Sequence, residues 1–465
     1  MIGQDKNVYF DADQIEAIAF SYENKEDFAE ALKVINYGLT LHPCNASLTL
    51  YKAKYLLFLD YIDEAGKIIS QLTDDSEEAL LVHIEYQFAR GDYQTGFDMI
   101  NRQMNSTDFN WEFALDVINI LWGYVTYNQI IDFINQALIR LPENMELQSE
   151  LAAIYQDNQE EDKAICLYNE ILERDPYNTD VWKELAKAHS LKKEFDKAIE
   201  ACDFALAINS RNEEILCIKG YCLYDSGEYQ QALDNFLEYE KISSDKSSAY
   251  DFISDCYIKL EKIPEAINYL KKALCLTPDN LHLLYQLAFC YQDMGNTPQA
   301  KEMLRQGLAI DNKQIDFHAM LAELLMQEEN YEESLAQYKE AFSLEPDNAE
   351  FPAIIGDLYE RIDRMDQAAV FYEKAHDLKK NDVKILFRLL LAYYAINQPE
   401  KAYSLSEEIM HLTDRFTQSD QELTEQERKE IEEANYMIDT LKKLLQELMD
   451  NNKSEDNNTN ESNTK

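Results

Sequence analysis

Three cysteines, Cys222, Cys256 and Cys290, recur at intervals of 34 residues. A cysteine thiolate is a nucleophile and a metal ligand, so this spacing raises the question of redox or zinc chemistry. Zinc needs four converging ligands, and Cys217, five residues before Cys222, cannot complete such a set. On successive packed helices the three positions would lie about 8–10 Å apart, too far for a disulfide or a shared metal. We therefore interpret these cysteines as small apolar core residues.

The seven histidines form no catalytic or metal-binding pattern, because none belongs to an HxxxH or HExxH pair. We expect His83, His189 and His318 in the core and His282 on an inner surface. The chain has only 11 glycines and contains no GxSxG, GxGxxG or phosphate-binding loop. The sequence therefore predicts no catalytic residue, no cofactor and no metal, and it predicts that the protein is not an enzyme.

The spacing of the cysteines belongs to a longer repeat. A register of 34 residues runs through residues 145–416 without insertion, as eight units, and four divergent units precede it at 12–45, 46–76, 77–110 and 111–144. Apolar residues at three- and four-residue intervals predict two helices in each unit. One column of the repeat is small in eleven of its twelve members: Ala31, Ala65, Gly96, Ile130, Ala164, Ala198, Ala232, Ala266, Ala300, Ser334, Ala368 and Ala402. Such a column marks the close approach of two helices, where a larger side chain would overpack the interface.

These columns resemble the tetratricopeptide repeat family, whose unit is a 34-residue helix–turn–helix. The residues that carry the resemblance are Trp182, Leu185, Ala186, Ala198 and Ala205 in one unit, and Tyr250, Ile253, Tyr257, Ala266, Ala273 and Pro278 in another. The resemblance covers about 12–416 and implies an all-α fold, a right-handed superhelical solenoid of stacked helix–turn–helix repeats. It implies an architecture for binding rather than a particular reaction. Because one unit is three residues short and Ile130 interrupts the small column, we expect irregular packing between about 46 and 144.

The two ends of the chain lie outside the repeats. Residues 1–11 form an N-terminal segment, and residues 417–450 are predicted to form a helix that begins with a capping box of Ser419 and Glu422. Its apolar residues are Ile431, Ala434, Ile438, Leu441, Leu445 and Leu448. Fewer than three heptads fit, so a capping helix on the last repeat is favoured over a coiled coil. Residues 451–465 contain no apolar residue and are predicted to be disordered.

The charge of the chain limits its partners. Lys and Arg total 43 against 88 Asp and Glu, a net charge of -45, which disfavours nucleic acid and anionic membrane surfaces. The N-terminus lacks the features of a secretory signal, and no run of about 18 apolar residues occurs. The cysteines form no disulfide framework, so we expect a reducing, cytoplasmic location.

The resemblance also implies where a ligand would bind. Stacked first helices of this family line a concave groove through repeat positions 2, 5, 9, 12 and 13. At those positions the candidate peptide-binding residues are Tyr221, Tyr224, Asp251, Asp255, Tyr285, Phe289, Gln292, Asp293, Glu323, Met326, Asp357 and Glu360. Aromatic residues among carboxylates suit a basic, partly apolar peptide or helix of a protein partner. A clamp for a partner's carboxylate would use Lys183 and Lys187, but the asparagine that accompanies such lysines is missing.

Two alternatives remain open at this point. The acidic inner face is also consistent with a solvated surface that has no dedicated ligand. A different function, that of a self-associating assembly factor, would use the C-terminal helix to form a homodimer.

Overall fold

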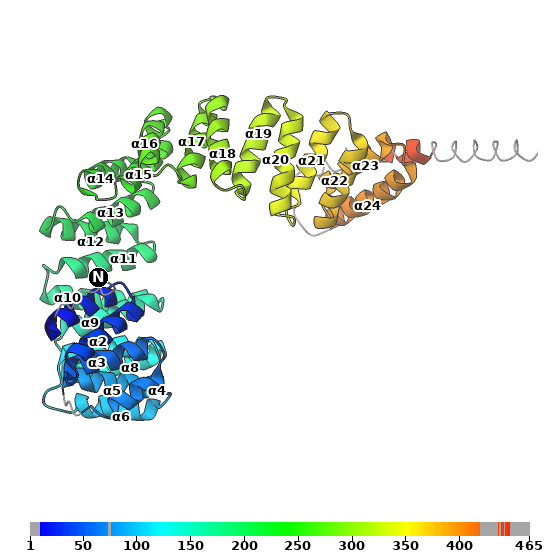
Figure 1. Cartoon of the computed structure of the whole chain (residues 1–465). Helices are drawn as coiled ribbons and strands as arrows, with labels where there is room; N and C mark the ends of the chain where they lie inside the picture. The colour runs from blue at the N-terminus through cyan, green and yellow to red at the C-terminus, as the bar shows by residue number, and fades with distance from the viewer. Residues whose placement is uncertain (1–9, 73–75, 419–435, 437–438, 441, 447–465) are drawn as a thin grey trace, which may run out of the picture. The chain divides into compact units, whose positions relative to one another are not determined.

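The computed structural model describes residues 10–72, 76–418, 436, 439–440 and 442–446. The described residues form helices and turns without a strand, which confirms the predicted all-α class (Figure 1). The helices are α1 (Ala12–Glu23), α2 (Phe28–Leu41), α3 (Ala46–Phe58), α4 (Ile62–Ile69), α5 (Glu77–Ala89), α6 (Tyr93–Met104), α7 (Trp111–Trp122), α8 (Tyr127–Arg140), α9 (Met145–Asp157), α10 (Glu161–Arg174), α11 (Thr179–Leu191), α12 (Phe195–Ile208), α13 (Glu213–Asp225), α14 (Tyr229–Ile242), α15 (Lys246–Lys259), α16 (Ile263–Leu276), α17 (Leu281–Asp293), α18 (Thr297–Ile310), α19 (Ile315–Gln327), α20 (Tyr331–Leu344), α21 (Glu350–Arg361), α22 (Met365–Leu378), α23 (Val383–Ala395) and α24 (Pro399–Gln418).

The chain divides into two compact units, residues 1–235 and 236–465, with the boundary inside α14. Within each unit the helices pack as hairpins, such as α11 with α12 in the first unit and α15 with α16 in the second. In most hairpins the second helix then packs against the first helix of the next hairpin, as α16 does against α17. In the second unit α17 to α24 follow one another in chain order (Figure 1).

The turns inside the hairpins share one backbone conformation. In eleven turns the residue at repeat position 15 has a positive φ, and the members are Glu26, Asp60, Gly91, Gln159, Lys193, Gly227, Glu261, Gly295, Glu329, Asp363 and Asn397. The next residue then donates its N–H to a carbonyl five residues earlier, as Lys262 does to Tyr257 at 2.9 Å. This left-handed cap satisfies the last carbonyls of the first helix. The turn around Val125 has no left-handed residue.

Asparagine and aspartate cap the start of many first helices. The side chain of Asn144 accepts a hydrogen bond from the backbone N–H of Leu147 at 2.8 Å, and Asn280 accepts one from Leu283 at 3.3 Å. Equivalent caps are made by Asn45, Asn110, Asn178 and Asn212. An asparagine in this position supplies an acceptor for a backbone donor that the helix itself leaves unpaired. Where they occur, the side-chain caps fix where a first helix begins, and the left-handed turns fix where a hairpin reverses.

Small and apolar columns form the core between the helices. All twelve members of the small column, from Ala31 to Ala402, are buried. Cys222, Cys256 and Cys290 are fully buried as well, which confirms their packing role. Burial raises the pKa of the Cys256 thiol to about 12, so the reactive thiolate is disfavoured at neutral pH.

The short repeat and the C-terminal end depart from the regular pattern. The second helix of the short unit, α4, has 8 residues, whereas most second helices have 14. Most of the predicted 417–450 helix, residues 1–9 of the predicted N-terminal segment and the predicted 451–465 tail lie outside the described residues. In the described part, Leu445 is fully buried in one cluster with Leu405, Ile409 and Leu412 of α24. Lys442 pairs with Glu407 at 3.1 Å.

Candidate functional site

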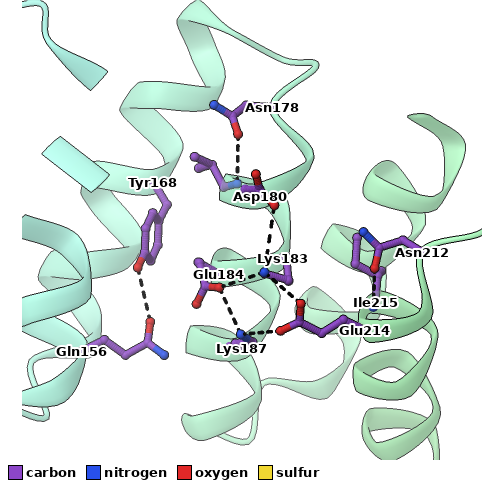
Figure 2. A network of polar contacts seen from close by, with 11 residues as sticks. Gln156, Tyr168, Asn178, Asp180, Lys183, Glu184, Lys187, Asn212, Glu214 and Ile215 are labelled. Carbon is purple, nitrogen blue, oxygen red and sulfur yellow. Dashed lines mark hydrogen bonds and ion pairs between the residues drawn. The ribbon is translucent and has the colours of Figure 1, made fainter. Parts of the chain in front are cut away.

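A compact cluster of charged side chains on the first unit joins α11 to α13 (Figure 2). The ammonium nitrogen of Lys183 lies 2.9 Å from Glu214 Oε2, and that of Lys187 lies 3.0 Å from Glu214 Oε1. Lys187 also pairs with Glu184 at 3.0 Å. The hydrogen bonds from both lysines lower the pKa of the Glu214 carboxyl. Because the chain's own carboxylates hold both lysines, this cluster does not present free ammonium groups for a partner's carboxylate.

The same register occurs in the second unit with the opposite charges. Lys183 and Lys187 occupy repeat positions 5 and 9 and face position 2 of the next unit. Helix α15, in a later repeat, carries Asp251 at position 5 and Asp255 at position 9. They face α17, where His282 Nε2 lies 3.8 Å from Asp251 Oδ2. The expected inner-surface position of His282 agrees with this contact.

A hydrogen bond ties the two helices together beside this pair. Gln286 of α17 donates from Nε2 to Oδ1 of Asp255 at 2.6 Å. Two acceptor atoms next to this bond have no donor: Asp251 Oδ1 and Gln286 Oε1 are both buried and unpaired. A buried acceptor without a donor is costly, since it has lost its water without a replacement. The arrangement therefore favours any group that brings N–H donors.

The electrostatics of the two carboxyls agree with this geometry. Burial and the nearby charge of Asp255 together raise the pKa of Asp251 to about 6, against the lowering effect of His282. Burial also raises the pKa of Asp255, while the hydrogen bond from Gln286 opposes that rise. No lysine or arginine in the described part of the chain lies within ion-pair distance of either carboxylate. Two undercompensated negative charges thus lie side by side on α15.

Aromatic residues continue the same side of α17. His282, Tyr285, Gln286 and Phe289 follow at intervals of three, one and three residues, which places them on one face of a helix. Tyr285 is half-buried, with its ring centroid 5.3 Å from that of Phe317, whereas Phe289 is 49% exposed. We call the surface formed by Asp251, Asp255, His282, Tyr285, Gln286 and Phe289 the α15–α17 face. It combines negative charge with an accessible aromatic ring.

Two other predicted residues of the second unit, Asp357 and Glu360, already have partners in the chain. The hydroxyl oxygen of Tyr372 lies 2.7 Å from Asp357 Oδ1 and 3.0 Å from Glu360 Oε2. Arg388 also forms an ion pair with Asp357. These interactions connect α21, α22 and α23, so both carboxylates contribute to packing between hairpins.

The remaining predicted residues are spread over several helices. In the second unit Asp293 and Glu323 are exposed, Gln292 is half-buried, and Met326 packs partly against the core. In the first unit Tyr221 is 44% exposed, and the Tyr224 ring lies 5.4 Å from that of Tyr229.

Sequence reasoning missed Gln286 and Arg388, which both occupy repeat position 6 and bind an aspartate at position 9 of the preceding unit. The usable signal was a polar residue at position 6 that follows an aspartate 31 residues earlier.

Neither a metal site nor a membrane span occurs among the described residues. No group of three or more His, Cys, Asp or Glu side chains there is placed to hold a metal ion. Among the described helices, none has the length and apolar character needed to cross a membrane.

Comparisons with known proteins identify the repeats. Two family models described as tetratricopeptide repeat match residues 257–324 and 319–383, and a model described as anaphase-promoting complex, cyclosome, subunit 3 matches residues 192–273. No curated protein matches the chain.

Solved structures with a similar arrangement of helices include three that differ in how much of the chain they cover. The C-terminal part of a TPR repeat-containing protein from Cytophaga hutchinsonii is 17% identical, with a TM-score of 0.44 over 50% of this chain and 95% of that one. YrrB, described as a TPR protein with an unusual peptide-binding site, is 20% identical, with a TM-score of 0.35 over 41% of this chain and 97% of that one. The APC/C hetero-tetramer Cut9-Hcn1 contains a chain 15% identical, with a TM-score of 0.35 over 80% of this chain and 74% of that one.

The family assignment rests on the matching repeat models and on the paired helices described above. Those helices bury the small column that the sequence predicted, and the recurrent left-handed turn joins them in pairs. Residues 257–383 of this chain match tetratricopeptide repeat models, and the described helices have the all-α repeat fold that those models predict.

Proposed function

We propose that this protein is a non-enzymatic interaction scaffold that holds a basic, partly apolar peptide or helix of a protein partner on the α15–α17 face. The observation that carries the proposal is the pair Asp251 and Asp255, two carboxylates without a lysine or arginine partner among the described residues. The same α15–α17 face includes Phe289, whose side chain is 49% exposed. The chain's paired helices and repeat models support a protein-binding role in general.

Charge and chemistry favour a basic partner over other classes. The net charge of -45 attracts cationic segments and repels phosphate backbones and anionic lipid surfaces. Carboxylates bind Lys and Arg side chains through charge-assisted hydrogen bonds, and aromatic rings supply most of the apolar contact area in peptide interfaces. We place this interaction in the cytoplasm, because the sequence pattern of the cysteines suits a reducing compartment.

Selection from a random library of displayed 12-residue peptides, with the full-length protein as bait, tests the proposal. The selected peptides should be enriched in Lys, Arg and large apolar residues, and fluorescence polarisation should give their dissociation constants. Phe289→Ala should weaken binding at least about tenfold, the loss typical of an interface hot spot. Circular dichroism should remain unchanged, because this side chain is half exposed.

A matched control distinguishes a loss specific to the α15–α17 face from a general effect of removing an exposed aromatic ring. Tyr394 is 42% exposed on α23 of the same unit and lies outside the α15–α17 face. Tyr394→Ala should bind the selected peptides like the wild type. Enrichment of acidic peptides, or equal losses in the two variants, would show that the proposal is wrong.

A further inference from the structure

We infer that the α15–α17 face contains a subsite for one arginine side chain, formed by Asp251, Asp255 and Gln286. This inference rests on the proposed function, because it names the partner side chain that the face would recognise. It starts from the unusual state of the acceptors, of which Asp251 Oδ1 and Gln286 Oε1 are buried without a donor.

The acceptors come from two helices that a direct bond holds in register. The bond from Gln286 Nε2 to Asp255 Oδ1 at 2.6 Å fixes the amide with its oxygen as the free end. That orientation is set by the carboxylate, which can only accept, so rotation of the amide cannot supply the missing donor. The other oxygen of Asp251, Oδ2, lies 3.8 Å from His282 Nε2, beyond hydrogen-bond distance. Asp251, Asp255 and Gln286 carry five side-chain oxygens between them. Asp255 Oδ1 accepts the bond from Gln286, and Asp251 Oδ1 and Gln286 Oε1 are buried without a donor.

The chain shows elsewhere how a guanidinium suits this register. Arg388 occupies the same repeat position as Gln286, and Asp357 the same position as Asp255. There Arg388 Nη1 forms an ion pair with Asp357 Oδ2. At the α15–α17 step the shorter, neutral Gln286 takes the place of the arginine and donates one hydrogen bond to the aspartate. Arg388 therefore balances the charge of Asp357 from within the chain, whereas the charge of Asp255 is left for a cation from outside the chain.

Donor geometry favours arginine over lysine. A guanidinium carries five N–H donors in a planar fork that matches carboxylates, whereas an ammonium group carries three on a single nitrogen. Two carboxylates and an amide oxygen on adjacent helices offer more acceptors than one ammonium can use. The His282 side chain is 61% exposed, and the Asp251 side chain beside it keeps 20% of its surface exposed.

Competition between peptides of equal charge tests the inference. Fluorescein-labelled hexaarginine, hexalysine and hexacitrulline are titrated with the full-length protein at 150 mM NaCl, and polarisation gives the dissociation constants. We expect hexaarginine to bind about tenfold more tightly than hexalysine, and hexacitrulline, which keeps the shape but lacks the charge, to bind least. Asp251→Asn should abolish the preference for arginine.

The control removes the same charge from the same surface. Asp293 is exposed at the end of α17, away from the unpaired acceptors, and Asp293→Asn should weaken both cationic peptides equally while the preference for arginine remains. Equal affinity for hexaarginine and hexalysine, or the same response in Asp251→Asn and Asp293→Asn, would overturn the inference. Those results would leave the proposed function intact if Phe289→Ala still impairs the selected peptides. If the preference for arginine is retained but Phe289→Ala does not impair binding of the selected peptides, the subsite stands and the proposed function is wrong.

Discussion

The side-chain amide of Gln286 donates a hydrogen bond to Asp255 at 2.6 Å while its own oxygen is buried without a donor. The bond joins α15 to α17 and fixes the amide in the orientation that leaves this acceptor unused. Replacements at this one position can therefore change both the stability of the hairpin interface and its affinity for a cation.

Gln286→Arg should make the protein more stable and prevent it from binding hexaarginine. The new guanidinium can pair with Asp255 and Asp251 from within, as Arg388 pairs with Asp357 in the corresponding register. Thermal unfolding should show a higher Tm, and fluorescence polarisation should show loss of the arginine preference. Gln286→Leu serves as control, because it removes the hydrogen bond without adding a charge and should lower the Tm. A variant Gln286→Arg that still prefers hexaarginine would contradict the assignment of the subsite.

The affinity for hexaarginine should increase as the pH rises from 5 to 7.5. Burial and the charge of Asp255 raise the pKa of Asp251 to about 6, so below that pH the carboxyl is protonated and attracts a cation weakly. Protonation of His282 would add a competing cation beside Asp251, and Lys259 is the other charged group that acts on Asp255. Asp251→Asn should flatten this part of the pH profile in polarisation titrations. An unchanged profile in the variant would assign the dependence to other carboxylates.

Glu85→Gln should stabilise the first unit at pH 8 and have no effect at pH 4. Glu85 is 8% exposed on α5, and burial raises its pKa from 4.5 to about 7. Because the folded state keeps the proton to a higher pH than the unfolded state, the free energy of unfolding decreases as the pH rises from about 4.5 to 7. The neutral amide avoids this loss, which is about 3 kcal/mol. Urea unfolding at several pH values measures the difference, and Glu146→Gln, at an exposed position, should show none.

Glu261→Gly should increase the free energy of unfolding by about 0.5–1 kcal/mol. Glu261 has a φ of 57°, in the left-handed region that costs an L-residue about 1–2 kcal/mol, and glycine's greater freedom in the unfolded chain offsets part of the gain. The matched control is Val125→Gly, because the turn at Val125 has no left-handed residue and glycine there should only destabilise. Chemical denaturation of both variants decides the matter, and a destabilised Glu261→Gly protein would refute the turn argument.

Leu445→Ala should destabilise the second unit by about 2–5 kcal/mol, the usual cost of a truncated core leucine. Leu445 is fully buried in the cluster that contains Leu405 and Ile409 of α24, whereas its neighbour Leu444 is 45% exposed. Leu444→Ala is therefore the control, with little expected change in Tm. Light scattering of the same variants tests the homodimer alternative. A wild-type dimer that becomes a monomer in Leu444→Ala would favour self-association through the 417–450 segment over a capping role.

The fold could be predicted from the sequence because its determinants repeat. A small residue such as Ala266 is buried wherever the column recurs, so twelve copies of a weak local signal agree. The site is harder to predict, because its properties depend on pairs of residues that differ from unit to unit. Asp255 and Asp357 occupy the same repeat position, yet the second is paired with Arg388 and the first has no arginine or lysine partner among the described residues. That difference arises from the residue 31 positions further on, which a reading of single columns does not include.

The turn that recurs at position 15 and the buried columns hold each hairpin in shape regardless of which residues occupy positions 6 and 9. Duplication of such a repeat in evolution would copy its whole architecture. A later codon change at position 6, from glutamine to arginine or the reverse, would then remove or create a cation-binding site. A new binding specificity could therefore evolve while the protein stays folded.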